Sequence, residues 1–274
     1  MSIAVIVSTY NAPRELELVL CALTRQTVLP DEILIADDGS GGETRRLIDR
    51  WRERFQVPLL HSWQRDAGYR KARIVNEAIR RSRGARLLFL DGDSFPHRRW
   101  VEDHLEVDDP GLVACGRRVK LGPELSRDVS IDDIMAGRFD RPGTQLLSSA
   151  IRGDTRRLGL GVRLPRSVAR VLHPRPRRLM GVNYSLSREA FYAVNGLDEE
   201  WAFYGREDLD LELRLQRARY RFYPLINRAI VYHLHHTERE RSPEALALVE
   251  RQREASHVRC DRGVESSESF DPQA

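Results

Sequence analysis

Apolar and polar positions alternate between two kinds of segment along the first 110 residues of the chain. Short, mostly apolar runs predict strands at residues 3–8, 32–38, 57–63 and 86–91, and the β-branched run at 3–8 predicts a strand that is covered on both faces. Between them lie segments with apolar side chains at helical spacing, of which the clearest cover residues 14–25 and 71–82. Strands that alternate with helices of this length predict right-handed βαβ units. We therefore expect an α/β fold, with a Rossmann-like, mostly parallel sheet and flanking helices.

Composition narrows this picture to one principal globular domain. The chain has 274 residues, of which 41% are hydrophobic and 31% are charged, and its formal net charge is +4. Nearly all basic residues are arginine, with Lys71 and Lys120 as the exceptions. Because this bias is typical of a GC-rich genome, we predict no nucleic-acid partner.

Three scattered cysteines argue against a disulfide framework, and no stretch approaches the roughly 18 apolar residues of a membrane span. A cytoplasmic protein is expected.

Polar residues follow three of the predicted strands. They lie at residues 8–11, 37–40 and 91–93, which read STYN, DDGS and DGD. In open parallel sheets, ligands bind outside the carboxyl ends of the strands. These three segments are therefore expected to converge on one crevice.

Asp91 and Asp93 flank Gly92 at the end of the fourth strand. In an extended segment alternate side chains point the same way, so both carboxylates can face one space, where they repel each other unless a cation lies beside them. A divalent metal such as Mg²⁺ or Mn²⁺ would resolve that conflict. The alternative is an Asp-rich turn that caps the following helix.

Asp38 has two interpretations as well. It can form a turn before a helix, or its carboxylate can accept hydrogen bonds from a base or from ribose hydroxyls. We favour the ligand role. The chain contains neither G-x-G-x-x-G after the first strand nor G-x-x-x-x-G-K-[ST], so a dinucleotide fold and a P-loop are not supported.

Glu207 and Asp208 begin a predicted helix, where the backbone N–H groups stabilise carboxylates. That simple explanation does not account for the aromatic residues directly before them, Trp201, Phe203 and Tyr204. Aromatic faces beside carboxylates suit a sugar ring, whose CH groups stack while its hydroxyls form hydrogen bonds. A carboxylate held against a hydroxyl is also a candidate general base.

Three histidines close a predicted late strand, AIVYHLHH. Each alone is typical of a partly buried polar residue. In an extended strand His233 and His235 would share one face and His236 would lie on the other. One or two of them could complete a metal shell that begins at Asp93, and nitrogen ligands favour Mn²⁺ over Mg²⁺.

The remaining segments carry weaker patterns. GLVACGRRV, residues 111–119, predicts a strand. Residues 152–178 contain nine arginines and only one acid, Asp154, and predict a mobile or surface-lying segment. It could be a lid over a bound ligand, or a contact with an anionic membrane surface. The polar residues 257–274 predict a disordered tail.

Together the motifs VSTYN, IADDGS, RKARIVNEAI, FLDGDSFP, GVNYSLSREAFYAVNGLDEE, FYGREDLDLELRL and VYHLHH resemble a known family. It is the family 2 type of inverting glycosyltransferases with the GT-A fold, and the C-terminal half is similar to the galactosyltransferase-type module. The resemblance covers residues 3–110 and 179–236. It implies a nucleotide-sugar-binding half (1–116), a variable arginine-rich segment (117–178) and an acceptor-binding, catalytic half (179–256).

The resemblance implies roles for individual residues. The donor-binding set is Ser8, Tyr10, Asn11, Asp38, Arg73, Asn76, Asp91, Gly92 and Asn183, with Asn183 at the donor-sugar edge. The metal site, for Mn²⁺ or Mg²⁺, is Asp93 with His233 or His236. The acceptor side is shaped by Asp198, Trp201, Tyr204 and Glu207. Asp208 would be the catalytic base.

The implied reaction is hexosyl transfer with inversion, from a nucleotide-sugar, most often a UDP-sugar, to a hydroxyl of a glycan, lipid-linked or small-molecule acceptor. The metal would neutralise the departing diphosphate. A role in bacterial polysaccharide biosynthesis follows, in the cytoplasm with an optional peripheral contact at the inner face of the cell membrane. Two alternatives remain: a nucleotidyltransferase, which would need a glycine-rich basic loop where TYNA stands at 9–12, and a non-catalytic protein that binds nucleotides or anionic surfaces.

Overall fold

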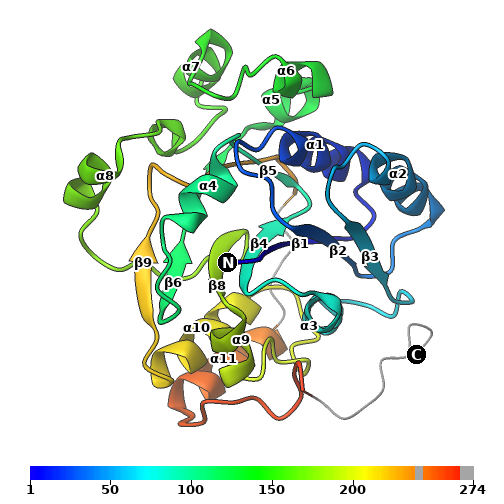
Figure 1. The fold of residues 1–274 in the computed structure, drawn as a ribbon, viewed down its shortest axis with the longest axis vertical. Coiled ribbons are helices and arrows are strands. Elements are labelled where there is room, and N and C mark those ends of the chain that lie inside the picture. The colour runs from blue at the N-terminus through cyan, green and yellow to red at the C-terminus, as the bar shows by residue number, and fades with distance from the viewer. Residues whose placement is uncertain (238–242, 266–274) are drawn as a thin grey trace.

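A seven-stranded sheet forms the centre of the protein in the computed structural model, which describes residues 1–237 and 243–265 (Figure 1). The strand order is β3-β2-β1-β4-β8-β6-β9. The first four strands are mutually parallel, β8 is antiparallel to β4 and β6, and β9 is parallel to β6. The strands are β1 (Ile3–Thr9), β2 (Glu32–Asp37), β3 (Leu59–Trp63), β4 (Arg86–Asp91), β6 (Leu112–Cys115), β8 (Asn183–Ser187) and β9 (Arg221–Pro224).

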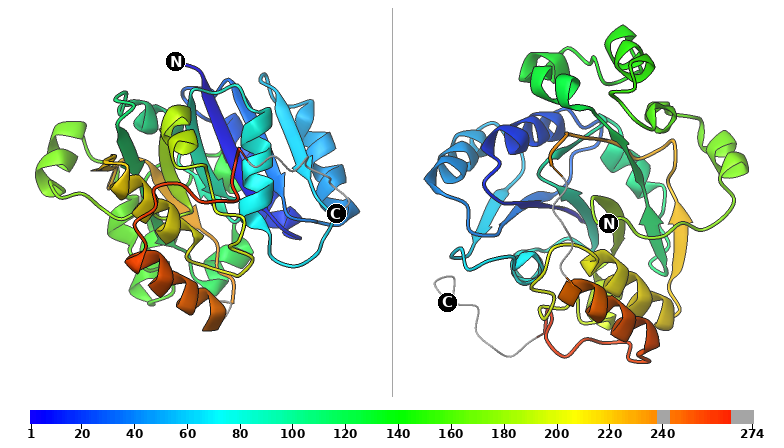
Figure 2. Two further views of the ribbon diagram at one scale, coloured as in Figure 1. Left: turned by 90° about the horizontal axis from the view of Figure 1, so that it is seen from below. Right: turned by 180° about the vertical axis from the view of Figure 1, so that it is seen from behind.

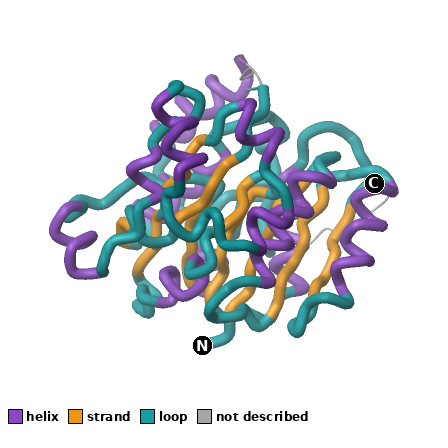
Figure 3. Tube along the Cα trace, turned by 90° about the horizontal axis from the view of Figure 1, so that it is seen from above, coloured by secondary structure: helices purple, strands orange, loops and turns teal. Residues whose placement is uncertain are grey.

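Helices cover both faces of this sheet, as Figures 2 and 3 show. In β1, Val5 and Val7 pack toward α1 (Pro13–Thr24) and α2 (Gly42–Arg52), while Ile6 packs on the other face toward α3 (Lys71–Arg81). Both faces of β1 are therefore buried, which explains its continuous apolar run. The predicted helices at 14–25 and 71–82 are confirmed as α1 and α3.

A second, three-stranded sheet joins the two halves of the chain. It has the order β5-β10-β7, formed by β5 (Ser94–Pro96), β10 (Ile230–His233) and β7 (Arg117–Lys120). β5 and β10 are antiparallel, with His233 opposite Ser94, and the amide of Leu234 donates to the carbonyl of Asp93 at 2.9 Å. This pairing brings the histidines next to the DGD segment, although they lie 140 residues away in sequence.

The remaining helices lie around the sheets. They are α4 (Trp100–Leu105), α5 (Pro123–Asp128), α6 (Ile131–Met135), α7 (Thr144–Ile151), α8 (Arg166–Leu172), α9 (Arg188–Ala193), α10 (Glu207–Arg217) and α11 (Pro243–Glu254), with one 3₁₀ helix, η1 (Leu158–Gly161). Within residues 1–237 and 243–265, none of the helices has the length and apolarity that crossing a bilayer requires.

Two predicted segments need correction. The single strand expected at residues 111–119 is two strands, β6 and β7, in different sheets. The two strands are separated by Gly116, where a Cβ atom would lie 2.2 Å from the side-chain amide of Asn183. The expected disordered tail is wrong for residues 257–265, because Cys260 and Val264 are buried and Arg80 donates to the carbonyl of Val264 at 2.8 Å. Residues 266–274 lie outside the described part.

The arginine-rich segment 152–178 lies at the surface, as predicted, but it is anchored at several points. The backbones of Lys120 and Arg156 pair in an isolated β-bridge. Arg163 forms an ion pair with the buried carboxylate of Asp103, at 2.6 Å. The segment therefore packs on the body through its first half, while α8 and the residues after it are mostly exposed.

Candidate active site

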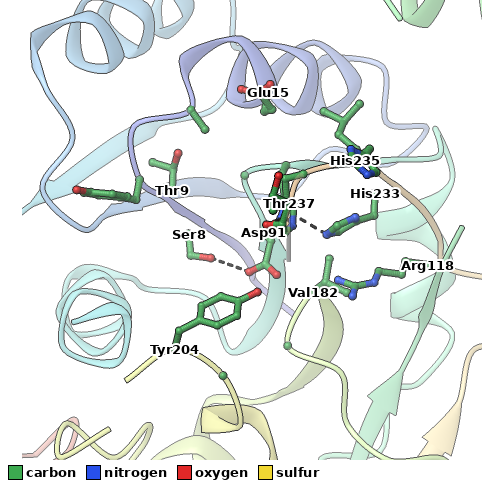
Figure 4. Close-up of a pocket in the computed structure, with 18 of the residues that line it drawn as sticks. Ser8, Thr9, Glu15, Asp91, Arg118, Val182, Tyr204, His233, His235 and Thr237 are labelled. Atoms are coloured by element: carbon green, nitrogen blue, oxygen red, sulfur yellow. Dashed lines mark hydrogen bonds and ion pairs between the residues drawn. The ribbon is translucent and has the colours of Figure 1, made fainter. Parts of the chain in front are cut away.

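A cavity of about 1880 Å³ opens at the carboxyl ends of β1, β2 and β4. It contains polar residues from both halves of the chain. Those predicted from the sequence are Ser8, Tyr10, Asn11, Asp38, Asp91, Gly92, Asp93, Tyr204, Glu207, Asp208, His233 and His236. Figure 4 shows several of these side chains pointing into the same space. The DGD segment and Asp208 therefore share one cavity, as the sequence predicted.

At the β1 and β2 end of the cavity, Asp38 is held in place by its neighbours. The amide of Arg70 donates to the carboxylate at 2.9 Å, and the side chain of Gln64 donates to its other oxygen. Burial raises the pKa of Asp38 despite these bonds. Nearby, the hydroxyl of Tyr10 donates to Asp66 at 2.9 Å. Asn11 lies in the turn after β1, and its side chain accepts from the amide of Gly41.

Asp91 has a cationic partner that sequence reasoning missed. Lys71, the first residue of α3, places its Nζ 2.8 Å from Asp91 and 3.4 Å from Glu207. The hydroxyl of Ser8 also donates to Asp91, at 2.8 Å (Figure 4). Burial alone would lower the pKa of Lys71, but the carboxylates of Asp91 and Glu207 outweigh it and raise that pKa well above its usual value. The cation beside Asp91 is therefore a lysine of the chain itself, whereas one interpretation of the sequence was a divalent metal beside both carboxylates of the DGD segment.

Gly92 is required for close approach between two strands. Its amide donates to the carbonyl of Ser8 at 2.7 Å, and a Cβ atom there would lie 2.9 Å from the same oxygen. A larger residue at this position would push the DGD segment away from β1.

Asp93, His233 and His236 form a group whose possible ligand atoms all lie within 4.8 Å of one another. The Nε2 atoms of His233 and His236 are 3.6 Å and 3.3 Å from Oδ2 of Asp93. Burial lowers the pKa of His233 to about 4, so its imidazole is neutral at neutral pH. Two imidazoles and one carboxylate fit a divalent transition metal such as Mn²⁺.

The geometry of the histidines corrects the expected pattern. β10 ends at His233, so the alternation of an extended strand does not continue to His236. His233 and His236 therefore turn to the same carboxylate, while the backbone amide of His235 donates to the hydroxyl of Ser126. His235 lines the cavity but lies outside the group of three.

Asp208 lies in the first turn of α10, with Glu207 beside it. The amide of Gly181 donates to its Oδ2 at 3.1 Å. Burial and the neighbouring charge of Glu207 raise the pKa of Asp208, which makes its carboxylate a stronger base than one in water. Glu207 is itself fixed, since the hydroxyl of Tyr69 donates to it at 3.0 Å.

Two asparagines predicted to contact the donor do not line the cavity. Asn183 is fully buried, where it accepts from the indole of Trp100 at 2.9 Å and donates to the carbonyl of Ala229 at 2.7 Å. Asn76 is equally buried and donates to the carbonyl of Leu197 at 2.8 Å. Both side chains form hydrogen bonds between distant segments of the core. The prediction that they contact the donor is corrected, because neither side chain reaches the cavity.

Three further predicted residues lie outside the cavity lining. Trp201 is buried against Leu209 and the helix α11, and its indole donates to the carbonyl of Gly205. Asp198 is buried, which raises its pKa to about 6, and it accepts from the amide of Glu200. Arg73 contacts Gln64 at 3.4 Å. On the predicted acceptor side, Tyr204 and Glu207 are the residues that reach the cavity.

Cationic residues of the cavity were also missed. Lys120, Arg118 and Arg156 line the side formed by β7 and the arginine-rich segment. The Nε atom of Arg118 is buried and has no hydrogen-bond partner within the described residues. One signal was available in the sequence: the two lysines of an otherwise arginine-based chain, Lys71 and Lys120, both face this cavity.

Comparison with known proteins decides the family. The sequence profile of "Glycosyl transferase family 2" matches residues 4–158, more than half of the chain. The chain belongs to glycosyltransferase family 2. A second profile, described as "N-terminal domain of galactosyltransferase", matches residues 172–237, which contain Asp208 and the histidines.

Curated relatives of this family 2 protein include a chondroitin synthase and a glucosyltransferase. The chain is 24% identical over 248 residues to chondroitin synthase of Pasteurella multocida, with 85% of this chain and 25% of that protein covered. It is 26% identical over 231 residues to validoxylamine A glucosyltransferase of Streptomyces hygroscopicus subsp. limoneus, with 78% and 47% covered. The chain thus spans about a quarter to a half of these relatives.

Solved structures share the GT-A fold. S. aureus TarS 1-349 in complex with UDP-GlcNAc has a TM-score of 0.58 at 17% identity, with 92% of this chain and 66% of that chain covered. The mannosyltransferase PcManGT from Pyrobaculum calidifontis, in complex with GDP-Man and Mn²⁺, has a TM-score of 0.53 at 17% identity, with 85% and 56% covered.

Proposed function

We propose that this family 2 protein is a metal-dependent, inverting glycosyltransferase. It moves a sugar from a nucleotide-sugar, most simply a UDP-sugar, to a hydroxyl of a glycan, lipid-linked or small-molecule acceptor. One observation carries the proposal: a single cavity contains the group of Asp93, His233 and His236 together with the carboxylate of Asp208. A diphosphate and an acceptor hydroxyl can therefore meet between them.

The nucleoside of the donor is expected at the end of the cavity near β1 and β2. There Tyr10, Asp38 and Asp66 offer acceptors for a base N–H and for ribose hydroxyls. The complexes of S. aureus TarS with UDP and UDP-GlcNAc support a UDP-sugar as donor. Ser8 and Lys71 fix Asp91 beside this region, so that Asp91 can contact the ribose or the donor sugar.

Asp93, His233 and His236 would hold the metal, Mn²⁺ in preference to Mg²⁺, because imidazole nitrogen suits a transition metal. When bound, the metal supplies positive charge that stabilises the departing diphosphate. Arg118 is expected to assist from the protein side. It acts electrostatically on both histidines, and its buried Nε has no partner within the described residues.

Asp208 would remove the proton from the acceptor hydroxyl. Its Oδ2 is fixed by the amide of Gly181, which orients the carboxylate toward the cavity. The oxygen that loses its proton attacks the anomeric carbon on the face opposite the diphosphate, and the bond from that carbon to the phosphate oxygen breaks. The configuration at the anomeric carbon therefore inverts.

The test is the substitution Asp208→Asn. Without the base, we expect turnover to fall by about 10²–10⁴-fold, while binding of UDP in the presence of Mn²⁺ is kept. Release of nucleoside diphosphate and calorimetric binding are the two measurements. Asp132→Asn on the exposed surface of α6 is the matched control and should change neither.

Unchanged release in Asp208→Asn would overturn the assignment of the base. If the wild-type protein binds nucleotide but releases no diphosphate with any nucleotide-sugar in a panel, the non-catalytic alternative holds instead. A preferred donor in the same panel identifies the nucleotide and the sugar.

A further inference from the structure

α8 and the residues that follow it, 166–178, form a projection that we call the α8 surface. Figure 2 shows α8 standing clear of the rest of the ribbon. Ala169 is the one side chain of the helix that is buried, whereas Val171 and Leu172 are 78% and 58% exposed. Val168, one turn before Leu172, is also exposed. Exposure of an apolar edge of this kind to water raises the free energy, and covering the edge lowers it.

The α8 surface is strongly basic. The sequence has no acidic residue between Asp154 and Glu189. Arg166 lies 3.8 Å from Glu106, but within the described chain Arg170, Arg175 and Arg177 form no ion pair with a carboxylate. The exposed apolar side chains therefore lie among arginines of which three, Arg170, Arg175 and Arg177, are neutralised by no carboxylate of the described residues. Such a surface is complementary to an anionic partner that also offers an apolar layer.

We propose that the α8 surface docks on a membrane that contains anionic phospholipids. Val171 and Leu172 would enter the boundary between headgroups and acyl chains, and the arginines would bind lipid phosphates. Nucleic acid would satisfy the charge but would leave the apolar side chains in water. A second copy of the chain, docked through the same surface, would place like charges against each other. A membrane satisfies both features.

The position of the α8 surface connects it to the cavity. Arg156, which lies ten residues before α8, lines the cavity and pairs through its backbone with Lys120. The same segment thus forms part of the cavity wall and the proposed membrane contact. If the proposed function is correct, this arrangement favours an acceptor that is carried by the membrane. That last step rests on the proposed function, whereas the membrane contact does not.

The experiment is flotation of the full chain with vesicles, without donor or acceptor. Vesicles of phosphatidylcholine alone are compared with vesicles that contain phosphatidylglycerol. We expect binding to the anionic vesicles only. Arg170→Glu with Arg175→Glu should weaken this binding by about tenfold or more, since each arginine near such a surface contributes appreciably. Val171→Ser with Leu172→Ser should weaken it several-fold.

Two matched controls separate the α8 surface from general effects. Arg45→Glu with Arg50→Glu changes the net charge equally on the exposed face of α2, and Leu246→Ser removes an exposed apolar side chain from α11. Both should bind as the wild type does. All of these residues are exposed, and thermal unfolding checks that each variant is folded.

Absence of binding to anionic vesicles would overturn the proposal, as would equal losses in the α2 control. Binding to duplex RNA without binding to vesicles would assign the surface to nucleic acid. A wild-type dimer that the Val171 and Leu172 changes dissociate, without vesicle binding, would assign it to a second copy. Asp208→Asn should float with anionic vesicles as the wild type does, so failure of the catalytic proposal and of this one are distinguishable.

Discussion

The two walls of the cavity are built differently. On the wall formed by β1, β2, β4 and α10, the carboxylates already have hydrogen-bond partners: Ser8 and Lys71 donate to Asp91, and Tyr69 donates to Glu207. On the wall formed by β7 and the residues after β10, a buried nitrogen of Arg118 has no partner among residues 1–237 and 243–265, and the side chain of His236 is 41% exposed.

This difference indicates which parts of the site are complete before a ligand arrives. The first wall is fixed by its own hydrogen bonds, so under the proposed function it would orient the nucleoside and the carboxylate of Asp208 without rearrangement. The second wall offers nitrogen ligands and a guanidinium group, whose natural partners are a metal and a diphosphate. We therefore expect changes in the second wall to act mainly on the charged part of the donor.

Among changes to the two walls, removal of a metal bound by Asp93, His233 and His236 should reduce turnover the most. A chelator is expected to lower turnover by at least about 100-fold, because the diphosphate loses a charge partner worth several kcal/mol. Mn²⁺ should restore activity better than Mg²⁺. His233→Ala should reproduce the loss, and His235→Ala, which lines the cavity outside the group of three, is the control. Full turnover in excess chelator would contradict the metal site.

Arg118→Ala should have the next largest effect, a loss of about 10- to 100-fold in turnover. The measurement that isolates its role is inhibition by product: affinity for UDP should fall, while affinity for uridine stays the same. Arg118→Lys should restore part of the affinity for UDP. Equal losses for UDP and uridine would mean that Arg118 supports the shape of the cavity rather than the diphosphate.

Asn183→Ala distinguishes a structural asparagine from a donor contact. The change leaves the indole of Trp100 and the carbonyl of Ala229 without their partner in the core, so the free energy of unfolding should fall by about 2 kcal/mol. Denaturant unfolding measures the loss. Donor affinity of the folded variant should not change. The opposite result, normal stability with lost donor affinity, would restore the role that the sequence predicted.

A pair of charge changes should give the smallest effect, a shift of the pH profile. If Asp208 is the base, it acts in its ionised form, so kcat/KM should rise with pH through the pKa of Asp208. Glu207 raises that pKa and Lys71 lowers it. Glu207→Gln should therefore move the acidic limb to lower pH and Lys71→Met to higher pH, each on the order of one pH unit. Shifts in the same direction would exclude Asp208 as the titrating group.

The sequence was most informative where one physical cause acts alone. Continuous apolar runs predicted the buried parallel strands, and polar residues at strand ends predicted the crevice. The acidic pair at the start of α10 was also placed correctly at a helix N-terminus.

Sequence reasoning was less successful where a polar residue has two plausible uses. Asn76, Asn183 and Trp201 stand within motifs of the family, yet they satisfy buried hydrogen bonds or fill the core. A family motif indicates that a residue is required at a position. It does not indicate whether that residue binds a ligand or stabilises the fold. Lys71 was missed for the converse reason, because its partners Asp91 and Glu207 come from distant segments that only the fold brings together.

The described end of the chain has a consequence for engineering. Arg80 of α3 donates to the carbonyls of Val264 and Gly263 and contacts Glu199, while Asn195 donates to the carbonyl of Cys260. Residues 260–264 thus connect α3, which begins with Lys71, to the loop that precedes α10. A chimera that replaces residues 179–256 with those of a relative would therefore have to include residues 260–264 as well, or the distance between Lys71 and Asp208 would change.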